Sequence, residues 1–215
     1  LAAKRHGSFG KTEMWYVLQA DNDAEITVGF SKKLSKEEYL KHLNNKTLEK
    51  ILNVEKTFKG DVFMLPAGRL HAIGAGILLA EIQQTSDVTY RIYDYDRPDQ
   101  SGKPRELHTE LALDAIDFNH YNKYKTDYLI KTNEQINLAD CEYFRTNLFE
   151  ITKSYELDYF NKDTFIIFIC VEGKIRIEYQ GGSAELSQGE TILVPAVIKN
   201  LYLTPLLKSR LLEVY

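Results

Sequence analysis

The sequence has few cysteines and no long apolar run. Its two cysteines, Cys141 and Cys170, lie far apart and form no Cys-x-x-Cys pair, so we expect free buried thiols rather than a metal knuckle or a redox motif. No stretch approaches the roughly 18 consecutive apolar residues that a membrane helix needs, and the first residues lack the pattern of a secretory signal. These absences favour a cytoplasmic protein without a membrane-spanning helix.

An excess of positive charge is also missing. Lys and Arg number 27 against 31 Asp and Glu, which gives a formal net charge of -4. General affinity for nucleic acid requires a basic face that meets the phosphates, so this balance argues against a nucleic-acid partner and favours small-molecule chemistry. The 215 residues, 44% of them hydrophobic, suffice for one large all-β domain or for two small lobes that share a core.

Short apolar runs broken by Gly, Pro and Asp dominate the chain, a pattern typical of strands in a barrel or sandwich. Residues 14–30 contain two such runs around the turn at Asp21-Asn22-Asp23, and they predict a hairpin. Residues 35–52 instead show apolar side chains at helical spacing, with Ser35 and Glu38 as a capping box, and predict a small helical insertion. Further strands are expected over residues 76–83, 89–95, 143–151, 164–171, 174–179, 191–195 and 209–214.

A polar stretch over residues 98–119 separates two strand-rich halves, and we place the boundary between a first lobe, 1–115, and a second lobe, 116–215, within it. The first half contains Gly60-Asp61, an apolar run that ends at Pro66, and then His71. The Gly-Asp pair supports a tight turn, the apolar run crosses a barrel wall, and His71 starts a strand from which its side chain can point inward. This pattern resembles the second motif of the cupin superfamily, in which the histidine binds a metal.

The same pattern recurs in the second half. Gly189 and Pro195 have the spacing of Gly60 and Pro66, and Glu172-Gly173-Lys174 reads as a hairpin turn before them. Asn200, however, occupies the place that corresponds to His71. The repeat therefore predicts two cupin lobes, the second of them without a metal.

Three ordered motifs make the resemblance more specific. They are Gly-Lys-Thr-Glu-x-Trp-Tyr over residues 10–16, Pro-Ala-Gly-x-x-His-Ala-Ile over residues 66–73, and Glu-Ile-Gln-Gln-x-Ser-Asp-x-Thr-Tyr-Arg-x-Tyr-Asp-Tyr-Asp-Arg over residues 81–97. Together they resemble type I mannose-6-phosphate isomerases in their short bacterial form, members of the cupin superfamily. The resemblance implies an all-β fold with a small helical insertion, built as two cupin lobes (jelly-roll-like β-barrels) of which the first is incomplete.

The resemblance also implies roles for individual residues. Glu13 and His71 match zinc ligands, and carboxylate oxygen and imidazole nitrogen both suit that metal. Polar residues that line the sugar site correspond to Lys11 and Glu81. Arg91 matches the arginine that the family needs for catalysis. Arg97 matches a basic residue that faces the substrate phosphate, and Lys11 is expected to help it anchor that phosphate.

The family's two other metal ligands, a glutamine and a histidine, have no match in this chain. They are expected just before Leu1, and because the chain starts with Leu rather than Met we expect it to be a fragment. His6 is the nearest substitute, but its charged surroundings do not match the family pattern and we do not expect it to bind the metal. In the intact enzyme the resemblance implies one Zn²⁺ per chain.

The expected function is therefore zinc-dependent interconversion of mannose 6-phosphate and fructose 6-phosphate through a cis-enediol. The expected partner is thus a small molecule, a hexose 6-phosphate. Read singly, Glu13 can also be a solvated strand residue, His71 a hydrogen-bonded barrel histidine, and Arg91 an ion-pair partner of Asp87 or Asp94. A non-catalytic cupin module that binds sugars or effectors is the alternative, because fold alone does not fix function. A metal-dependent oxygenase is a weaker alternative, because such cupin enzymes usually need a histidine cluster and the sequence shows none. The remaining histidines, His42, His108 and His120, are expected in surface or loop positions.

Overall fold

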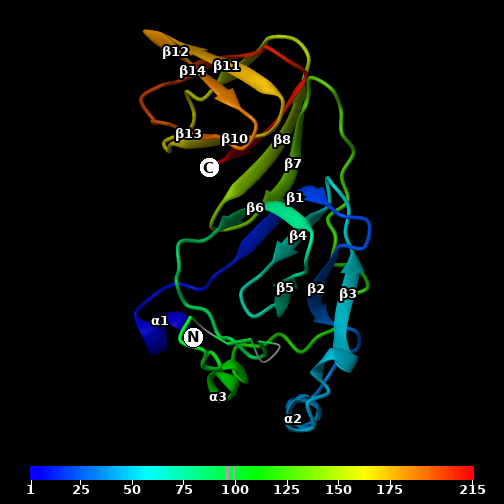
Figure 1. Cartoon of the computed structure of the whole chain (residues 1–215). Coiled ribbons are helices and arrows are strands. Elements are labelled where there is room, and N and C mark those ends of the chain that lie inside the picture. The colour runs from blue at the N-terminus through cyan, green and yellow to red at the C-terminus, as the bar shows by residue number, and fades with distance from the viewer. Residues whose placement is uncertain (95–96, 99) are drawn as a thin grey trace. The chain divides into compact units, whose positions relative to one another are not determined.

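The computed structural model describes residues 1–94, 97–98 and 100–215, and Figure 1 shows that its regular structure consists mainly of strands. Two compact units emerge, Leu1–Lys125 and Thr126–Tyr215. The boundary between them follows Lys125 rather than residue 115. The reason lies in the stretch over residues 98–119, where Ile116 and Phe118 pack against the apolar cluster around Tyr39 in the first unit.

The first unit contains two antiparallel sheets of three strands each, in the orders β4-β1-β6 and β3-β2-β5. Side chains from both sheets form one core, with Trp15 and Phe63 from the first sheet in contact with the cluster that holds Ile26 and Val28 from the second. The two sheets therefore pack face to face. Their strands are β1 (Glu13–Ala20), β2 (Glu25–Phe30), β3 (Leu52–Lys56), β4 (Val62–Leu65), β5 (His71–Ile73) and β6 (Ile77–Gln83).

The expected hairpin over residues 14–30 is wrong in its pairing, although both strands exist. β1 pairs with β4 and β6, whereas β2 pairs with β3 and β5. The turn at Asp21-Asn22-Asp23 carries the chain from one sheet to the other.

The turn at Gly173, expected to form a hairpin, likewise carries the chain from one sheet to the other, between β10 and β11 of the second unit. A Cβ at Gly173 would lie 2.3 Å from the Lys208 carbonyl oxygen. Turn residues predict a reversal of the chain, but they do not say which strand becomes the hydrogen-bonded neighbour.

The helical insertion is confirmed. Ser35 caps α2 (Lys36–Asn44): its hydroxyl accepts from the Glu38 amide at 3.2 Å, and the Glu38 carboxylate accepts from the Ser35 amide at 2.9 Å. These two bonds satisfy amides at the helix start that have no partner within the helix. The other helical elements of the unit are α1 (Ala2–His6), the 3₁₀ helix η1 (Leu48–Ile51) and α3 (Thr109–Ala112).

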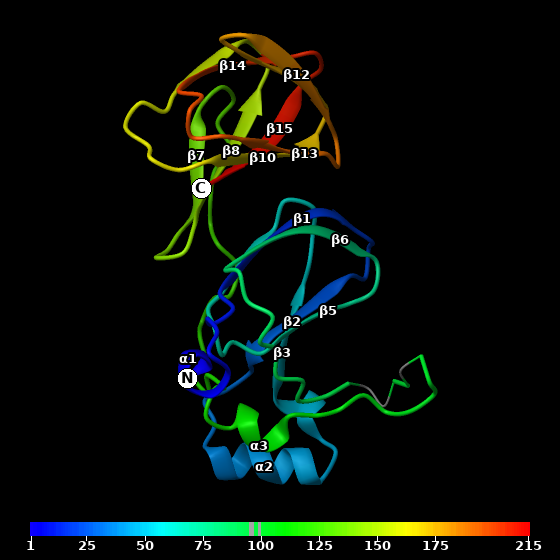
Figure 2. The same cartoon turned by 90° about the vertical axis from the view of Figure 1, so that its left-hand side faces the viewer.

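The second unit is a sandwich of a five-stranded sheet, β13-β10-β15-β8-β7, and a four-stranded sheet, β12-β11-β14-β9, all antiparallel (Figure 2). Its core includes Phe149, Phe168, Ile175 and Leu203, which come from both sheets. The strands are β7 (Gln135–Asp140), β8 (Arg145–Ile151), β9 (Tyr155–Asp158), β10 (Ile166–Glu172), β11 (Lys174–Tyr179), β12 (Gly182–Ser187), β13 (Thr191–Val194), β14 (Asn200–Pro205) and β15 (Ser209–Val214).

The repeated pattern falls on corresponding elements of the two units. Gly60 and Gly189 both have positive φ, 91° and 86°, and each precedes a four-residue strand, β4 or β13. His71 is the first residue of β5, and Asn200 is the first residue of β14. One expected strand, over residues 89–95, is wrong: residues 89–94 form no strand, and Tyr95 lies outside the described residues. No helix in the described part of the chain has the length and apolar character to cross a membrane.

A buried ion-pair network in the second unit makes its stability depend on pH. Burial raises the pKa of Glu150. A hydrogen bond from Thr132 and the contacts with Arg210 and Lys208 lower it by more, so that the pKa falls to about 2. A carboxylate with a depressed folded-state pKa stabilises the fold above its unfolded pKa, and this contribution is lost as the pH falls through the folded value.

We expect Glu150→Gln to lower the free energy of unfolding by about 2 kcal/mol near neutral pH, because charged hydrogen bonds are lost. The difference from wild type should shrink as the pH falls from about 4.5 towards about 2. Urea unfolding at several pH values measures it. Glu185→Gln is the matched control, since this carboxylate is 43% exposed and its ion pairs contribute about 0–1 kcal/mol. Equal losses for the two variants would contradict the expectation.

Candidate metal and substrate site

Three strands of the first unit, and the segment before one of them, bring together four of the residues that the sequence singled out. Glu13 starts β1, and Trp15, two residues later on the same face, lies opposite Glu81 of β6. His71 starts β5 in the facing sheet, opposite Val28. The segment before β1 adds Lys11, whose ammonium nitrogen lies 3.0 Å from Glu13 Oε1 and 3.3 Å from Glu81 Oε1.

Glu13 is the buried centre of this cluster, with only 1% of its side chain exposed. The Trp15 indole donates from Nε1 to Glu13 Oε2 at 2.9 Å, and His71 Nε2 lies 3.6 Å from Glu13 Oε1. Burial raises the pKa of Glu13, but His71 and Lys11 lower it by more, so the pKa lies below its ordinary value. The geometry thus holds a carboxylate in the interior of the unit, which does not fit the alternative of a solvated strand residue.

The imidazole of His71 is held at two points. Its Nδ1 donates to the Arg69 carbonyl oxygen at 2.7 Å, and its ring meets the Trp15 ring edge to face, with centroids 5.0 Å apart. A carbonyl oxygen only accepts, so Nδ1 carries a proton, and whenever the ring is neutral Nε2 keeps its lone pair. That lone pair is on the side of the ring nearest Glu13.

Glu13 and His71 suit a zinc ion both in chemistry and in spacing. Two donor atoms that each lie about 2.1 Å from a tetrahedral zinc are about 3.4 Å apart, and the observed Oε1 to Nε2 separation is 3.6 Å. Metal-binding histidines commonly donate their second ring nitrogen to a carbonyl oxygen, as His71 does. Within residues 1–94, 97–98 and 100–215, no group of three or more His, Cys, Asp or Glu side chains could hold a metal. Among the described residues, the expected donors Glu13 and His71 therefore form a pair without a third such side chain.

Lys11 joins Glu13 to Glu81. Burial lowers the pKa of Lys11, but the two carboxylates raise it by more. Glu81 is 33% exposed, and both side chains are therefore within reach of a bound molecule.

The structure holds Arg91 by its backbone rather than by an ion pair with Asp87 or Asp94. The Arg91 amide donates to His108 Nδ1 at 3.1 Å, and the His108 amide donates back to the Arg91 carbonyl at 2.7 Å. The Arg91 guanidinium donates from Nη1 to the Glu106 carbonyl oxygen at 3.2 Å. No interaction among the described residues joins Arg91 to the cluster around Glu13.

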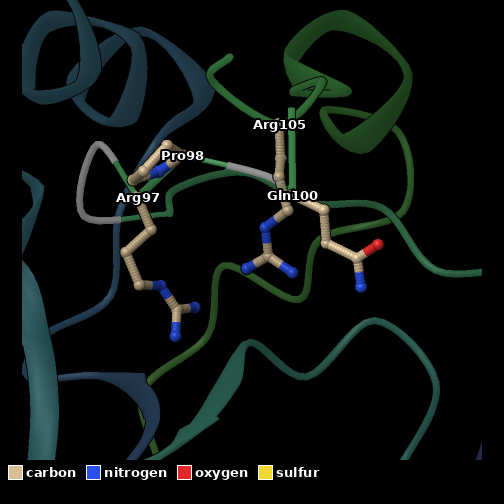
Figure 3. A pocket seen from close by; sticks show the side chains of 4 residues that line it. All are labelled: Arg97, Pro98, Gln100 and Arg105. Atoms are coloured by element: carbon tan, nitrogen blue, oxygen red, sulfur yellow. The ribbon is translucent and has the colours of Figure 1, made fainter. Parts of the chain in front are cut away.

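Arg97 lies beside a second arginine that the sequence did not point to. Asp94, with 7% of its side chain exposed, accepts from Arg97 Nη2 at 2.8 Å and also binds Arg105. The hydrogen bonds from Arg105 lower the pKa of Asp94, against the effect of burial, and Arg97 lowers it further. Figure 3 shows both guanidinium groups on the same side of the segment, where Arg97, Pro98, Gln100 and Arg105 line an open pocket of about 420 Å³.

The other histidines have local partners. His6 Nε2 lies 2.6 Å from the Tyr90 hydroxyl, and neither atom contacts the cluster around Glu13 among the described residues. His42 bonds to Thr47 and His120 to the Phe30 carbonyl. His108 lies in a loop, as expected, and from there it also holds the backbone of Arg91. No spacing in the sequence links residues 91 and 108, whereas Trp15 could have been identified as the same-face neighbour of Glu13 on an alternating strand.

Comparison with known proteins agrees with this fold. The family described as "Mannose-6-phosphate isomerase, cupin domain" matches residues 134–208. The mannose-6-phosphate isomerase ManA of Bacillus subtilis (strain 168) is 33% identical over 192 residues, which cover 88% of this chain and 60% of that protein. The mannose-6-phosphate isomerase of Streptococcus mutans serotype c is 32% identical over 200 residues, 93% of this chain and 62% of that protein.

The crystal structure of the mannose 6-phosphate isomerase from Bacillus subtilis superposes with a TM-score of 0.89 and 31% sequence identity. The match covers 100% of this chain and 68% of that one. The all-β, cupin-like fold expected from the sequence is thereby confirmed. The chain spans about 60% of the length of the curated relatives it matches.

Proposed function

The chain belongs to the mannose-6-phosphate isomerase family, and from this premise we propose that its protein is a zinc-dependent aldose-ketose isomerase that interconverts mannose 6-phosphate and fructose 6-phosphate. The observation that carries the proposal is the pairing of buried Glu13 with His71 Nε2 beside the charged pair of Lys11 and Glu81. Donors for a metal and polar groups for a sugar thus lie within one cluster. A cytoplasmic location belongs to the same proposal.

Glu13 and His71 hold the zinc in this proposal, within the first unit. Bound there, zinc supplies a Lewis acid that polarises oxygen atoms of the sugar. Trp15 orients both ligands, because its indole donates to Glu13 and its ring packs against His71. The second unit, where Asn200 starts the strand that corresponds to β5, is a metal-free structural partner.

Lys11 and Glu81 act on the sugar. Isomerisation between aldose and ketose moves a proton between C2 and C1 through a cis-enediol, and one base on one face of the sugar can do this. Glu81 is our candidate for that base, because its carboxylate is partly exposed beside the buried Glu13. The Lys11 ammonium, in contact with both carboxylates, donates hydrogen bonds to substrate oxygens and orients Glu81.

Arg91 and Arg97 complete the proposed site. The Arg91 guanidinium, bound only to a neutral carbonyl among the interactions described, stabilises the negative charge that develops on the enediolate. Arg97 anchors the phosphate, since a guanidinium offers paired donors in a plane that match phosphate oxygens. Asp94 supports this role because it holds Arg97 next to Arg105 at the pocket of Figure 3.

A direct assay tests the proposal. The protein, expressed from its complete reading frame and loaded with zinc, is expected to convert mannose 6-phosphate to fructose 6-phosphate, and a chelator should abolish turnover until zinc is restored. Glucose 6-phosphate, the C2 epimer, serves as the control substrate. Binding of sugar phosphate and zinc without turnover would reject the isomerase and support the alternative of a non-catalytic sugar-binding module.

A further inference from the structure

The turn that precedes His71 is fixed to a segment far along the chain, residues 115–121. The Asp117 amide donates to the Gly68 carbonyl at 2.9 Å. Gly68 has φ of +93°, and a Cβ at this position would lie 2.3 Å from the Ala115 carbonyl oxygen. The backbone of the turn therefore contacts this segment at a distance that only glycine allows.

The next residue, Arg69, adds a side-chain clamp. Its guanidinium carbon lies 4.1 Å from the centroid of the Tyr121 ring, and its Nη2 lies 3.3 Å from Asp117 Oδ2. The Tyr121 hydroxyl donates to the same Asp117 oxygen at 2.9 Å, which ties ring and carboxylate together. Only 10% of the Arg69 side chain is exposed, so its cation-π contact and ion pair are largely shielded from water, and loss of one partner would leave the other poorly compensated.

The backbone of Arg69 connects this clamp to the candidate metal site. The Arg69 carbonyl oxygen is the acceptor for His71 Nδ1, at 2.7 Å. Its direction depends on the Arg69–Leu70 peptide plane, which follows the Arg69 backbone that the side-chain clamp and the bond to the preceding Gly68 carbonyl restrain. A shift of that plane would lengthen the bond and free the imidazole to place its proton on Nε2, the atom nearest Glu13.

We propose that Arg69, clamped by Tyr121 and Asp117, is a positioning residue that fixes His71 in the Nδ1–H tautomer and so keeps Nε2 available to a metal. The inference rests on the proposed function insofar as it treats His71 as a ligand. The tautomer itself can be measured without metal and without turnover. Failure of the inference and failure of the proposed isomerase are therefore distinguishable.

The test uses the ¹⁵N-labelled protein without metal, at pH about 8.5, roughly two units above the ordinary pKa of histidine. Long-range ¹H–¹⁵N correlations report which ring nitrogen of His71 carries the proton. Wild type is expected to show the Nδ1–H form. Arg69→Met, which keeps an unbranched apolar stem but removes the charge and the planar group, should show a mixture with the Nε2–H form. Its affinity for Co²⁺ should fall about 10- to 100-fold, the usual effect of losing a group that orients a metal ligand.

Two further variants keep the test decisive. Tyr121→Ala removes the ring over Arg69 from a residue that is 39% exposed, so it should fold even if Arg69→Met does not, and it should shift tautomer and Co²⁺ affinity in the same direction. Arg5→Met is the matched control, because Arg5 also pairs with a carboxylate, Asp114, in the same unit. It should leave His71 unchanged. A folded Arg69→Met or Tyr121→Ala protein with the wild-type tautomer and Co²⁺ affinity would overturn the inference.

Discussion

Replacing His71 by alanine is expected to weaken zinc binding by more than about 100-fold, beyond the effect of losing an orienting group alone. His71 Nε2 is one of two donor atoms that lie at a separation suited to one zinc ion, and alanine removes it entirely. Turnover of mannose 6-phosphate should fall together with the zinc content. Competition with a chelating dye measures the affinity, and a coupled assay measures the turnover.

Glu13→Gln tests the second donor with little change in shape. The amide keeps an oxygen that can accept from the Trp15 indole, whereas the negative charge that attracts the metal is lost. We expect weaker zinc binding here too. His42→Ala is the control, since His42 lies on α2 in the same unit and bonds to Thr47. Zinc that stays bound in His71→Ala, or that is lost equally in His42→Ala, would contradict the assignment of His71.

The core of this site could be predicted from the sequence because it depends on local patterns. Strand alternation places Glu13 and Trp15 on one face, and the Gly-to-Pro spacing before His71 predicts a turn followed by a strand start. Recurrence of that spacing at Gly189 and Pro195 predicted the related second unit. These features extend over a few residues each, so periodicity and turn chemistry suffice to predict them.

Features that depend on contacts between distant segments could not be predicted in the same way. The turns at residues 21–23 and at Gly173 were expected to form hairpins, but in a two-sheet sandwich a strand can bury its apolar face against the opposite sheet instead. The bond between Arg91 and His108 and the contact of Arg69 with Tyr121 join segments with no shared pattern. Asp94 falls within the strand that was expected over residues 89–95, yet it lies outside any strand and holds two arginines.

Those long-range contacts also determine where the chain divides into units. A polar composition over residues 98–119 suggested the boundary between the lobes, whereas Ile116 and Phe118 pack on the helical cluster and the Leu34 amide donates to the Phe118 carbonyl at 3.1 Å. Farther on, the Tyr124 hydroxyl donates to the Phe30 carbonyl at 2.9 Å. The first unit therefore continues to Lys125 and includes residues that support the candidate site.

Arg91→Ala is expected to lower kcat by about 10²- to 10³-fold while zinc content stays at the wild-type level, because a donor to developing negative charge is removed and no metal ligand is touched. The fold should tolerate the change. Arg91 donates from its guanidinium to the Glu106 carbonyl in an exposed position, so water can replace it, and the backbone bonds with His108 remain. Steady-state kinetics and zinc analysis of the same preparation measure both quantities.

The distribution of the loss between kcat and KM separates catalysis from binding. An interaction made only in the transition state lowers kcat and kcat/KM together, whereas one made equally with the bound substrate raises KM. We expect the first behaviour for Arg91 and the second for Arg97→Ala, whose guanidinium is proposed to hold the unreacting phosphate. Arg176→Ala, at an exposed arginine of β11 that pairs with Glu185, is the control and should change neither parameter. Unchanged kcat in Arg91→Ala would remove Arg91 from the chemistry and leave the enediolate to be stabilised by other groups of the site.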